Sequence, residues 1–398
     1  MKDLPAIAGG HPVRTQYLVF GSPAIGEEEI SEVCDSLRSG WVGTGPKVKR
    51  FEEMFKTYKN SRHAVAVSSC TAALHLSLLA LGIERGDEVI TTTLTFAATA
   101  NCVVHLGATP ILADVELETM NIDPREVEKK ITKKTKAMIP VHLTGRPCDM
   151  GALMELAQRA HLHVVEDAAH AVEASYRGKP MGTLGDLGCF SFYVTKNLTT
   201  VEGGMVITDQ DALAKRVKNF ALHGLTEDAW RRFSDEGFRH YQVICAGFKY
   251  NMTDIQASLG IHPFKKLEAH AQRRETIWRR YQQSFQELPL FLPFPVPPDQ
   301  RHAYHLYTPL LDIDRLRRSR GEFLQALHQE NIGAGIHYIA LHLHPFYQET
   351  YGLRRGDFPN AEFISDRTIS LPLSGKLTDQ DVEDVIQAVR KILIYYSK

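Results

Sequence analysis

The feature that most constrains the fold is an alternation of short apolar segments with helix-like stretches between Phe51 and about Asp209. Strand-like "HAVAVS" leads into apolar "TAALHLSLLALGI", and "DEVITTT" leads into "FAATANCVVHLG". The segments "TPILADV", "KAMIPVH", "MGALMELAQRAH" and "LHVVEDAAHA" continue the rhythm. This pattern is typical of an α/β protein with a largely parallel sheet. Such sheets bind their ligands at the carboxyl ends of the strands.

The pattern changes after "NMTDIQASLG" at 251–260. A long, charged, amphipathic helix is predicted for "FKKLEAHAQRRETIWRRYQQSFQEL", and a proline-rich stretch follows it. A strand-like segment, a helix near 320–330 and a closing helix from about Asp379 complete the chain. We therefore expect a large domain over residues 1–262 and a smaller α+β domain over residues 263–398. A chain of 398 residues is long enough for both.

Composition excludes several classes of protein. The formal net charge of -1 creates no field that would attract nucleic acid or an anionic membrane. The sequence contains no apolar run of about 18 residues, so we expect no membrane span, and the N-terminal "MKDLPAIAGGHPVRTQ" lacks the apolar core of a signal peptide. Six scattered cysteines without a C-x-x-C pair favour a reduced cytoplasm over a disulfide framework.

Several common site motifs are absent from the sequence. "GWVGTGP" contains a G-x-G, but no strand precedes it and no third glycine follows at the dinucleotide-binding spacing. Neither G-x-x-x-x-G-K-[ST] nor G-x-S-x-G occurs. The "HLHPF" segment at 342–346 has no acidic or cysteine ligands at metal-binding spacing, so we expect no metal site.

The segment "FSFYVTKNLTTVEGG" at 190–204 holds a single lysine, Lys196, among aromatic and hydroxyl side chains. Its alternation predicts a short strand that runs into a loop. A lysine desolvated at the mouth of such a loop loses its proton near neutral pH and becomes a nucleophile toward carbonyl groups. The alternative is an ordinary lysine at a strand end, with its stem packed and its ammonium in water.

Three other strand ends carry side chains that could bind a ligand. Asp167 is the second of two acids that follow two β-branched residues in "VVEDAAHA", so its carboxylate needs a partner; alternatively it caps a helix that begins at Ala168. "SSCTAALHL" brings hydroxyls to a helix start, where phosphate binds; alternatively Ser69 or Thr71 is a plain N-cap. Phe96 in "TLTFAATAN" could stack on a flat ring, or could belong to the core.

Taken together, these four features point to one ligand. It has an aldehyde for a lysine, a protonated ring nitrogen for a carboxylate, a phosphate for a helix start and a flat ring for an aromatic side chain. Pyridoxal 5′-phosphate has all four groups. In this interpretation Lys196 forms the Schiff base, and Asp167 keeps the pyridine nitrogen protonated.

The ordered motifs resemble those of the DegT/StrS family of pyridoxal-phosphate sugar aminotransferases. The resemblance runs over nearly the whole chain, from "LRSGWVGTGPKVKRFEEMF" through "VVEDAAHA" and "GFKYNMTDIQASLG" to "ISLPLSGKLTDQDV". It implies the type I fold of pyridoxal-phosphate enzymes, with a mixed, mostly parallel seven-stranded sheet and a smaller C-terminal domain. It also implies a homodimer with active sites at the subunit interface.

The resemblance assigns roles to individual positions. Lys196 matches the Schiff-base lysine and Asp167 the partner of the pyridine nitrogen. It further implies that the cofactor is contacted by Ser191, Cys70, Thr71, His170, Phe96, Lys249 and Asn251, the last two acting on the neighbouring subunit's phosphate, and that the sugar is contacted by Trp41, His337 and Tyr338. The family usually has glycine at Cys70 and often glutamine at His170. Which of Lys249 and Asn251 makes the contact is open.

The resemblance also suggests the reaction. Family members that are dehydratases replace the Schiff-base lysine with histidine, and this chain has Lys196, which favours amino transfer. The segments "KNLTTVEGG", "HGLTEDAWRR" and "GFKYNMTDIQA" look most like enzymes that act on UDP-linked 4-keto sugars, including the 4-amino-4-deoxy-L-arabinose type. We expect L-glutamate as donor and a nucleotide-linked keto sugar as acceptor. The alternatives are a pyridoxal-phosphate dehydratase and a non-catalytic sensor that retains the fold.

Overall fold

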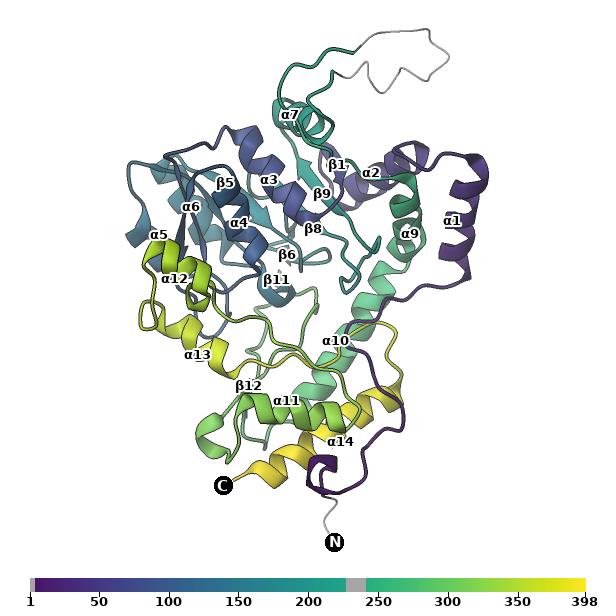
Figure 1. Ribbon diagram of the computed structural model, residues 1–398, viewed down its shortest axis with the longest axis vertical. Helices are drawn as coiled ribbons and strands as arrows, with labels where there is room; N and C mark the ends of the chain where they lie inside the picture. Colours follow the sequence, from purple (N-terminus) through teal and green to yellow (C-terminus); the bar gives the residue numbers. More distant parts are fainter. Residues whose placement is uncertain (1–3, 227–240) are drawn as a thin grey trace.

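The computed structural model describes residues 4–226 and 241–398 of the chain (Figure 1). A seven-stranded sheet forms its centre, in the spatial order β1-β9-β8-β5-β4-β2-β3. The strands are β1 (His63–Val67), β2 (Glu88–Thr92), β3 (Thr109–Ala113), β4 (Thr135–Ile139), β5 (His163–Asp167), β8 (Leu187–Ser191) and β9 (Gly204–Thr208). The sheet is mixed and mostly parallel, as predicted, because β9 alone of these seven runs antiparallel to its two neighbours.

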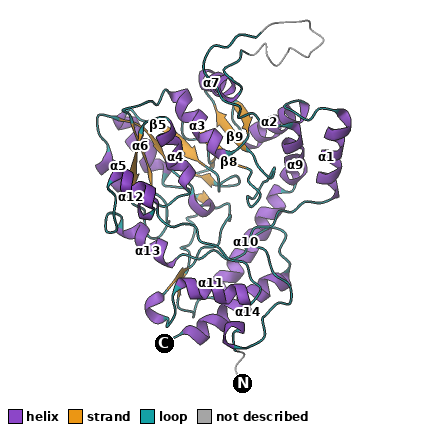
Figure 2. Ribbon diagram, viewed as in Figure 1, coloured by secondary structure: helices purple, strands orange, loops and turns teal. Residues whose placement is uncertain are grey.

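Helices cover both faces of this sheet (Figure 2). The α-helices described within the first 265 residues, not all of which lie on the sheet, are α1 (Glu27–Ser39), α2 (Pro46–Lys59), α3 (Cys70–Leu81), α4 (Ala97–His105), α5 (Pro124–Lys130), α6 (Met150–Ala160), α7 (Asp211–Ala221) and α9 (Asp254–Lys265). Neighbouring strand residues enter different cores: Val165 packs with α3, α4 and α7, whereas Val164 packs with α2, α5 and α6. Burial on both faces explains why the central strands are apolar runs rather than alternating ones.

Strand β8 differs from the sequence prediction. It ends at Ser191, and the following residues through Thr200 form turns and irregular backbone, whereas the alternation extended the strand to Thr195. All five residues of β8 are buried because the strand lies between β5 and β9. The apparent alternation of Phe192 and Tyr193 therefore reflects a loop that turns one ring inward and one outward.

The C-terminal part contains α10 (Leu267–Ser284), α11 (Arg320–Gln329), α12 (Pro345–Tyr351), α13 (Pro359–Arg367) and α14 (Asp379–Tyr396). Short strands accompany them: β10 (Leu290–Phe291) pairs with β12 (Leu310–Leu311), and β11 (Gln300–Arg301) pairs with β6 (Ser175–Tyr176), which pairs with β7 (Lys179–Pro180). Helices α10, α11 and α14 share a separate apolar core. Their place below the sheet is visible in Figure 1.

The predicted division between residues 262 and 263 falls inside α9, three residues before its end at Lys265. The long helix predicted from Phe264 to Leu288 is divided between two helices, because α9 ends at Lys265 and α10 begins at Leu267. The assignment of two domains remains a prediction. Among the described residues, no helix combines the length and the apolarity that crossing a bilayer requires.

Candidate active site

A cavity of about 470 Å³ lies at the edge of the sheet where β1, β2, β5 and β8 end. Since these four strands are parallel, the segments that follow them converge there. The cavity brings together nine of the predicted site residues: Cys70, Thr71, Phe96, Asp167, His170, Ser191, Lys196, His337 and Tyr338.

Lys196 lies in a turn after β8, where its backbone N–H donates to the carbonyl of Tyr193 at 2.9 Å. Burial lowers the pKa of the Lys196 amine to about 8, although Cys70 and Asp167 act in the opposite direction. No carboxylate among the described residues lies within 4.0 Å of this amine. Lys196 lines the cavity, and the lowered pKa favours the nucleophile over the solvated ammonium of the alternative interpretation.

Asp167 is the last residue of β5, and its carboxylate is buried in the cavity wall. Thr99 Oγ1 donates to its Oδ2 at 2.8 Å, and the N–H of Ala169 donates to its Oδ1 at 3.2 Å. Burial raises the pKa of Asp167, while these bonds and Lys196 lower it. Residues 168–174 form turns, so the carboxylate does not cap a helix. Thr99 was not predicted; its position one turn after Phe96 on α4 is the available signal.

The start of α3 forms another wall. Ser69 is the N-cap, and its hydroxyl accepts from the N–H of Ala72 at 3.0 Å. That part of the alternative interpretation is correct, yet the first N–H groups of a helix still lack intrahelical acceptors. Gly204 packs on this backbone: a Cβ there would lie 2.5 Å from Ser69 and 2.7 Å from the nitrogen of Cys70. The "GG" that closes the lysine segment therefore permits close contact with the helix start.

Aromatic side chains border the opposite wall. Phe96 is 62% exposed, so it does not belong to the core of this chain. Tyr338 lies 6.0 Å from Phe96 between ring centroids, and its hydroxyl is hydrogen-bonded to His170 Nε2 at 3.3 Å. Burial holds the pKa of His170 well below its usual value. Its buried Nδ1 has no hydrogen-bond partner among the described residues, so a polar group of a ligand would satisfy it.

Residues from the two parts of the chain meet here. His337, from the C-terminal part, shares a hydrogen bond of 2.7 Å between its Nδ1 and Ser370 Oγ. Burial lowers the pKa of His337 to about 4, so the ring is neutral at physiological pH. Ser191 is buried at the end of β8, and its hydroxyl accepts from the N–H of Tyr193 at 3.3 Å.

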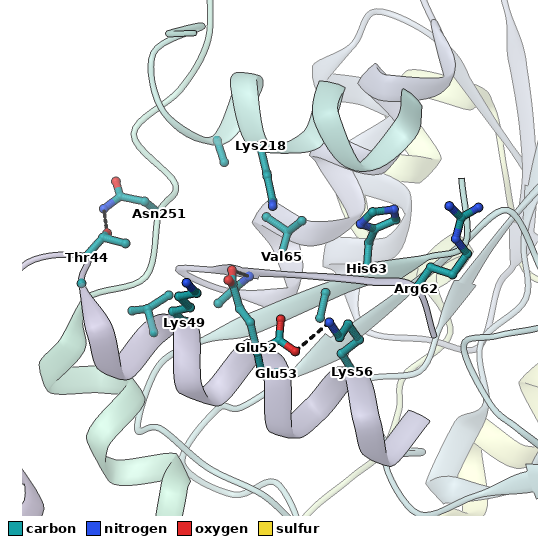
Figure 3. A pocket seen from close by; sticks show the side chains of 15 residues that line it. Thr44, Lys49, Glu52, Glu53, Lys56, Arg62, His63, Val65, Lys218 and Asn251 are labelled. Carbon is teal, nitrogen blue, oxygen red and sulfur yellow. Dashed lines mark hydrogen bonds and ion pairs between the residues drawn. The ribbon is translucent and has the colours of Figure 1, made fainter. Parts of the chain in front are cut away.

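Trp41, Lys249 and Asn251 do not line this cavity. Trp41 is 50% exposed, and Lys249 is exposed on a loop bridged to Leu222. Asn251 donates to Thr44 Oγ1 at 2.7 Å, at one end of a second cavity of about 530 Å³ (Figure 3). Residues 227–232 of the predicted "HGLTEDAWRR" motif lie outside the described residues.

The second cavity lies between α2, the edge strand β1 and α7. Figure 3 shows Lys218 on one side of it and Lys49 and Glu52 on the other. Glu52 accepts a hydrogen bond of 2.8 Å from the N–H of Ala66, and burial raises the pKa of its carboxyl to about 7. This cavity also holds lysines and carboxylates near the start of α2, but of the predicted site residues Asn251 alone lines it, whereas nine line the first cavity. We therefore assign the candidate site to the first cavity.

The histidines of "HLHPF" make protein contacts. His342 is buried, with Nδ1 2.8 Å from the hydroxyl of Thr93 and Nε2 3.0 Å from the carboxylate of Glu362. Within residues 4–226 and 241–398, no three histidine, cysteine, aspartate or glutamate side chains are grouped so that they could hold a metal ion.

Comparisons with known proteins agree with this arrangement. Protein MJ1066 of Methanocaldococcus jannaschii is 51% identical over 381 residues, which cover 96% of this chain and 99% of that protein. The spore coat polysaccharide biosynthesis protein SpsC of Bacillus subtilis is 49% identical over 382 residues, covering 96% and 98%.

Solved structures also match over nearly the full length. Spr1654 of Streptococcus pneumoniae, in its PLP form, superposes with a TM-score of 0.88 at 32% identity, covering 95% of this chain and 99% of that one. Its PMP form gives a TM-score of 0.87. The family model described as the DegT/DnrJ/EryC1/StrS aminotransferase family matches residues 23–390. The chain belongs to the DegT/DnrJ/EryC1/StrS aminotransferase family.

Proposed function

We propose that this enzyme transfers the amino group of L-glutamate to a nucleotide-linked keto-deoxysugar, with a UDP-linked 4-keto sugar as the expected acceptor. Family membership makes it a sugar aminotransferase dependent on pyridoxal phosphate. The observation that carries the proposal is a single cavity in which a half-buried lysine with a lowered pKa lies near a buried carboxylate and a helix start. The similarity to SpsC supports a sugar as acceptor.

The residues of the cavity fit the cofactor. Among the described residues, His170 Nδ1 has no hydrogen-bond partner and is available for a polar contact. Asp167, which accepts from Thr99, offers a carboxylate. The start of α3, which packs against Gly204, offers N–H donors. When bound, pyridoxal phosphate supplies an aldehyde that condenses with an amine and a ring that accepts the electron pair released at the neighbouring carbon. A ring beside Phe96 would bury much of that exposed aromatic surface.

In our proposal Lys196 would hold the cofactor covalently, and its amine would be free for proton transfer once glutamate is bound. Its pKa of about 8 means that a sizeable fraction of the free amine is neutral near neutral pH. A neutral amine can then remove the proton from the donor's α-carbon and deliver it elsewhere within reach. The same lysine thus serves first as a nucleophile and then as a general base.

Asp167 would hold the proton of the cofactor's ring nitrogen. Its negative charge is stabilised by Thr99 and Ala169, and a cationic ring nitrogen would complete the pairing that a buried carboxylate needs. The phosphate group is assigned to the helix start at Cys70 and Thr71 with Ser191, because N–H groups and hydroxyls at a helix N-terminus favour anions. His170 donates to the ring oxygen in this assignment.

The acceptor sugar is assigned to Trp41, His337 and Tyr338, and Lys249 and Asn251 to a phosphate in a neighbouring subunit. We propose a homodimer, in which a partner would cover Phe96 and Trp41. Thr71 also lies at an exposed rim of the cavity. A cytoplasmic location is proposed because all six cysteines are unpaired.

The test is to incubate the pure protein with glutamate, pyridoxal phosphate and a panel of nucleotide-linked keto sugars. The expected result is 2-oxoglutarate in equal amount to an amino sugar identified by mass spectrometry and NMR. Loss of water from the sugar without an amino product would indicate a dehydratase. A colourless protein that ignores added cofactor would indicate a non-catalytic binding protein. Either result would refute the proposal.

A further inference from the structure

Asn197, the residue after Lys196, makes three side-chain hydrogen bonds. Its Nδ2 donates to Glu173 Oε2 at 2.9 Å and to the carbonyl of Ala303 at 3.0 Å. Its Oδ1 lies 3.0 Å from Nδ1 of His305. An amide with all of these contacts satisfied has one orientation, and that orientation fixes the turn next to the lysine.

The partners determine where the protons are. Both partners of Nδ2 are pure acceptors, so the amide cannot be flipped, and Oδ1 must accept from His305. His305 therefore carries a hydrogen on Nδ1. Burial holds the pKa of His305 well below its usual value, and four nearby groups act in the same direction: Lys196, His337, Arg274 and His302. Its Nε2 is therefore unprotonated.

Glu173 links this amide to the C-terminal part of the chain. Its other oxygen, Oε1, accepts from Arg274 on α10, and both side chains are buried. Arg274 Nε also donates to the carbonyl of Ala303 at 3.4 Å, the same carbonyl that Asn197 contacts. A buried ion pair is retained only when its remaining hydrogen bonds are satisfied, and Asn197 provides one of them. The lysine turn and α10 are thus joined through one buried group.

The same network reaches the far wall of the cavity. The rings of His305 and His170 lie 4.5 Å apart between centroids. His170 in turn contacts the hydroxyl of Tyr338. The backbone N–H of His305 donates to the carbonyl of Thr144 at 3.0 Å, which helps to hold the backbone of His305 in position. A displacement of Asn197 would therefore change the positions of both Lys196 and His170.

We infer that Asn197 is a positioning residue for Lys196, held by Glu173, Arg274 and His305, and that this Asn197 cluster sets the direction from which the lysine amine meets the cofactor. The inference rests on the proposed function, since it assigns a role relative to the cofactor. Asn197 has no contact with the reacting atoms in this assignment. It acts by restricting the lysine turn and the His305 ring that packs on His170.

The test uses the full-length protein with pyridoxal phosphate and three variants. Asn197→Ala removes the three bonds without adding charge. The double variant Asn197→Asp/Glu173→Gln restores the amide–carboxylate hydrogen bond with donor and acceptor exchanged, but the carboxylate that replaces the Asn197 amide cannot donate to the carbonyl of Ala303. Asn360→Ala is the control, because Asn360 also donates from a partly buried amide to a backbone carbonyl, that of Val115 at 2.8 Å, but lies outside the cavity.

Two readouts are measured: the pH midpoint of the cofactor's visible absorbance without substrate, and kcat and KM for glutamate. Asn197→Ala should shift the pH midpoint by on the order of half a pH unit. It should also lower kcat about tenfold with little change in KM, because the lysine amine is no longer correctly oriented. The double variant should recover part of both effects, because the contacts to Glu173 and His305 return and the contact to Ala303 does not. Asn360→Ala should lower thermal stability and leave both readouts unchanged.

A wild-type midpoint and kcat in Asn197→Ala would overturn the inference. So would a double variant no closer to wild type than Asn197→Ala, since restored hydrogen bonding would then have no effect. A wild-type protein that takes up no cofactor would refute the proposed function itself, and the inference with it. The two failures differ, because the first leaves wild-type cofactor binding intact.

Discussion

Two lysines of this enzyme lie against the same part of the sheet, and they differ in what surrounds the amine. Lys59, at the end of α2, is fully buried: Nζ donates to the carbonyls of Val172 at 2.7 Å and Met181 at 2.9 Å. It also lies 4.5 Å from the ring centroid of Phe190 on β8. Lys196 follows the same strand but faces an open cavity.

The comparison separates proton affinity from reactivity. Burial lowers the pKa of Lys59 to about 7 and that of Lys196 to about 8, so both amines lose their protons more readily than a surface lysine does. Only Lys196 has space in front of it for a carbonyl compound. A lowered pKa is therefore insufficient to identify a nucleophile, and access decides between the two lysines.

Of the two lysines, substitution of Lys196 should have the larger effect on activity. Lys196→Ala should reduce transamination about 10⁴-fold or more, because one change removes both the covalent anchor and the proton carrier. Lys59→Met should retain most activity at a temperature where the variant is folded. The measurement is steady-state formation of 2-oxoglutarate. Appreciable turnover by Lys196→Ala would contradict the assignment.

A smaller effect is expected for substitution of Asp167, the carboxylate in the cavity that Lys196 lines. Asp167→Asn keeps the shape of the side chain but removes the charge assigned to the ring nitrogen. We expect the variant to bind some cofactor and to lose about 100-fold in kcat, as when one preorganised electrostatic contact is removed. Rapid-scanning absorbance during the half-reaction with glutamate measures the step directly. An unchanged rate would show that Asp167 does not have this role.

The third prediction concerns stability. The pKa of Lys59 in the folded protein, about 7, is below the 10.5 of an unperturbed lysine, so the unfolded chain binds more protons between these values. This residue should therefore make the free energy of unfolding rise from pH 7 to about 10.5, and Lys59→Met should remove that rise. Urea unfolding of cofactor-free protein across this range measures it. Parallel curves for wild type and variant would contradict the prediction.

The order of strands and helices was predictable because each central strand is an apolar run followed by a helix with a clear start. The end of β8 was not, because Phe192 and Tyr193 alternate in a loop as they would in a strand. The break at Lys266 was also missed, since the charged amphipathic pattern continues through the junction of α9 and α10.

At the site, Lys196 could be identified because it stands out in a segment otherwise poor in charge, and Asp167 because it lies at the end of an apolar strand. Lys59 could not: in "MFKTYKNS" it looks like any lysine at the end of an exposed helix. The ion pair of Glu173 with Arg274 joins residues about a hundred positions apart, and nothing local in the sequence indicates it. Long-range polar pairs of this kind depend on tertiary packing rather than on periodicity.

The most direct test of the central claim is to reduce the cofactor-loaded protein with borohydride and to locate the modified lysine by peptide mapping. We predict a pyridoxyl group on Lys196 and none on Lys59, although both amines have a lowered pKa. A label on Lys59, or an unlabelled Lys196 in protein that has taken up the cofactor, would contradict it.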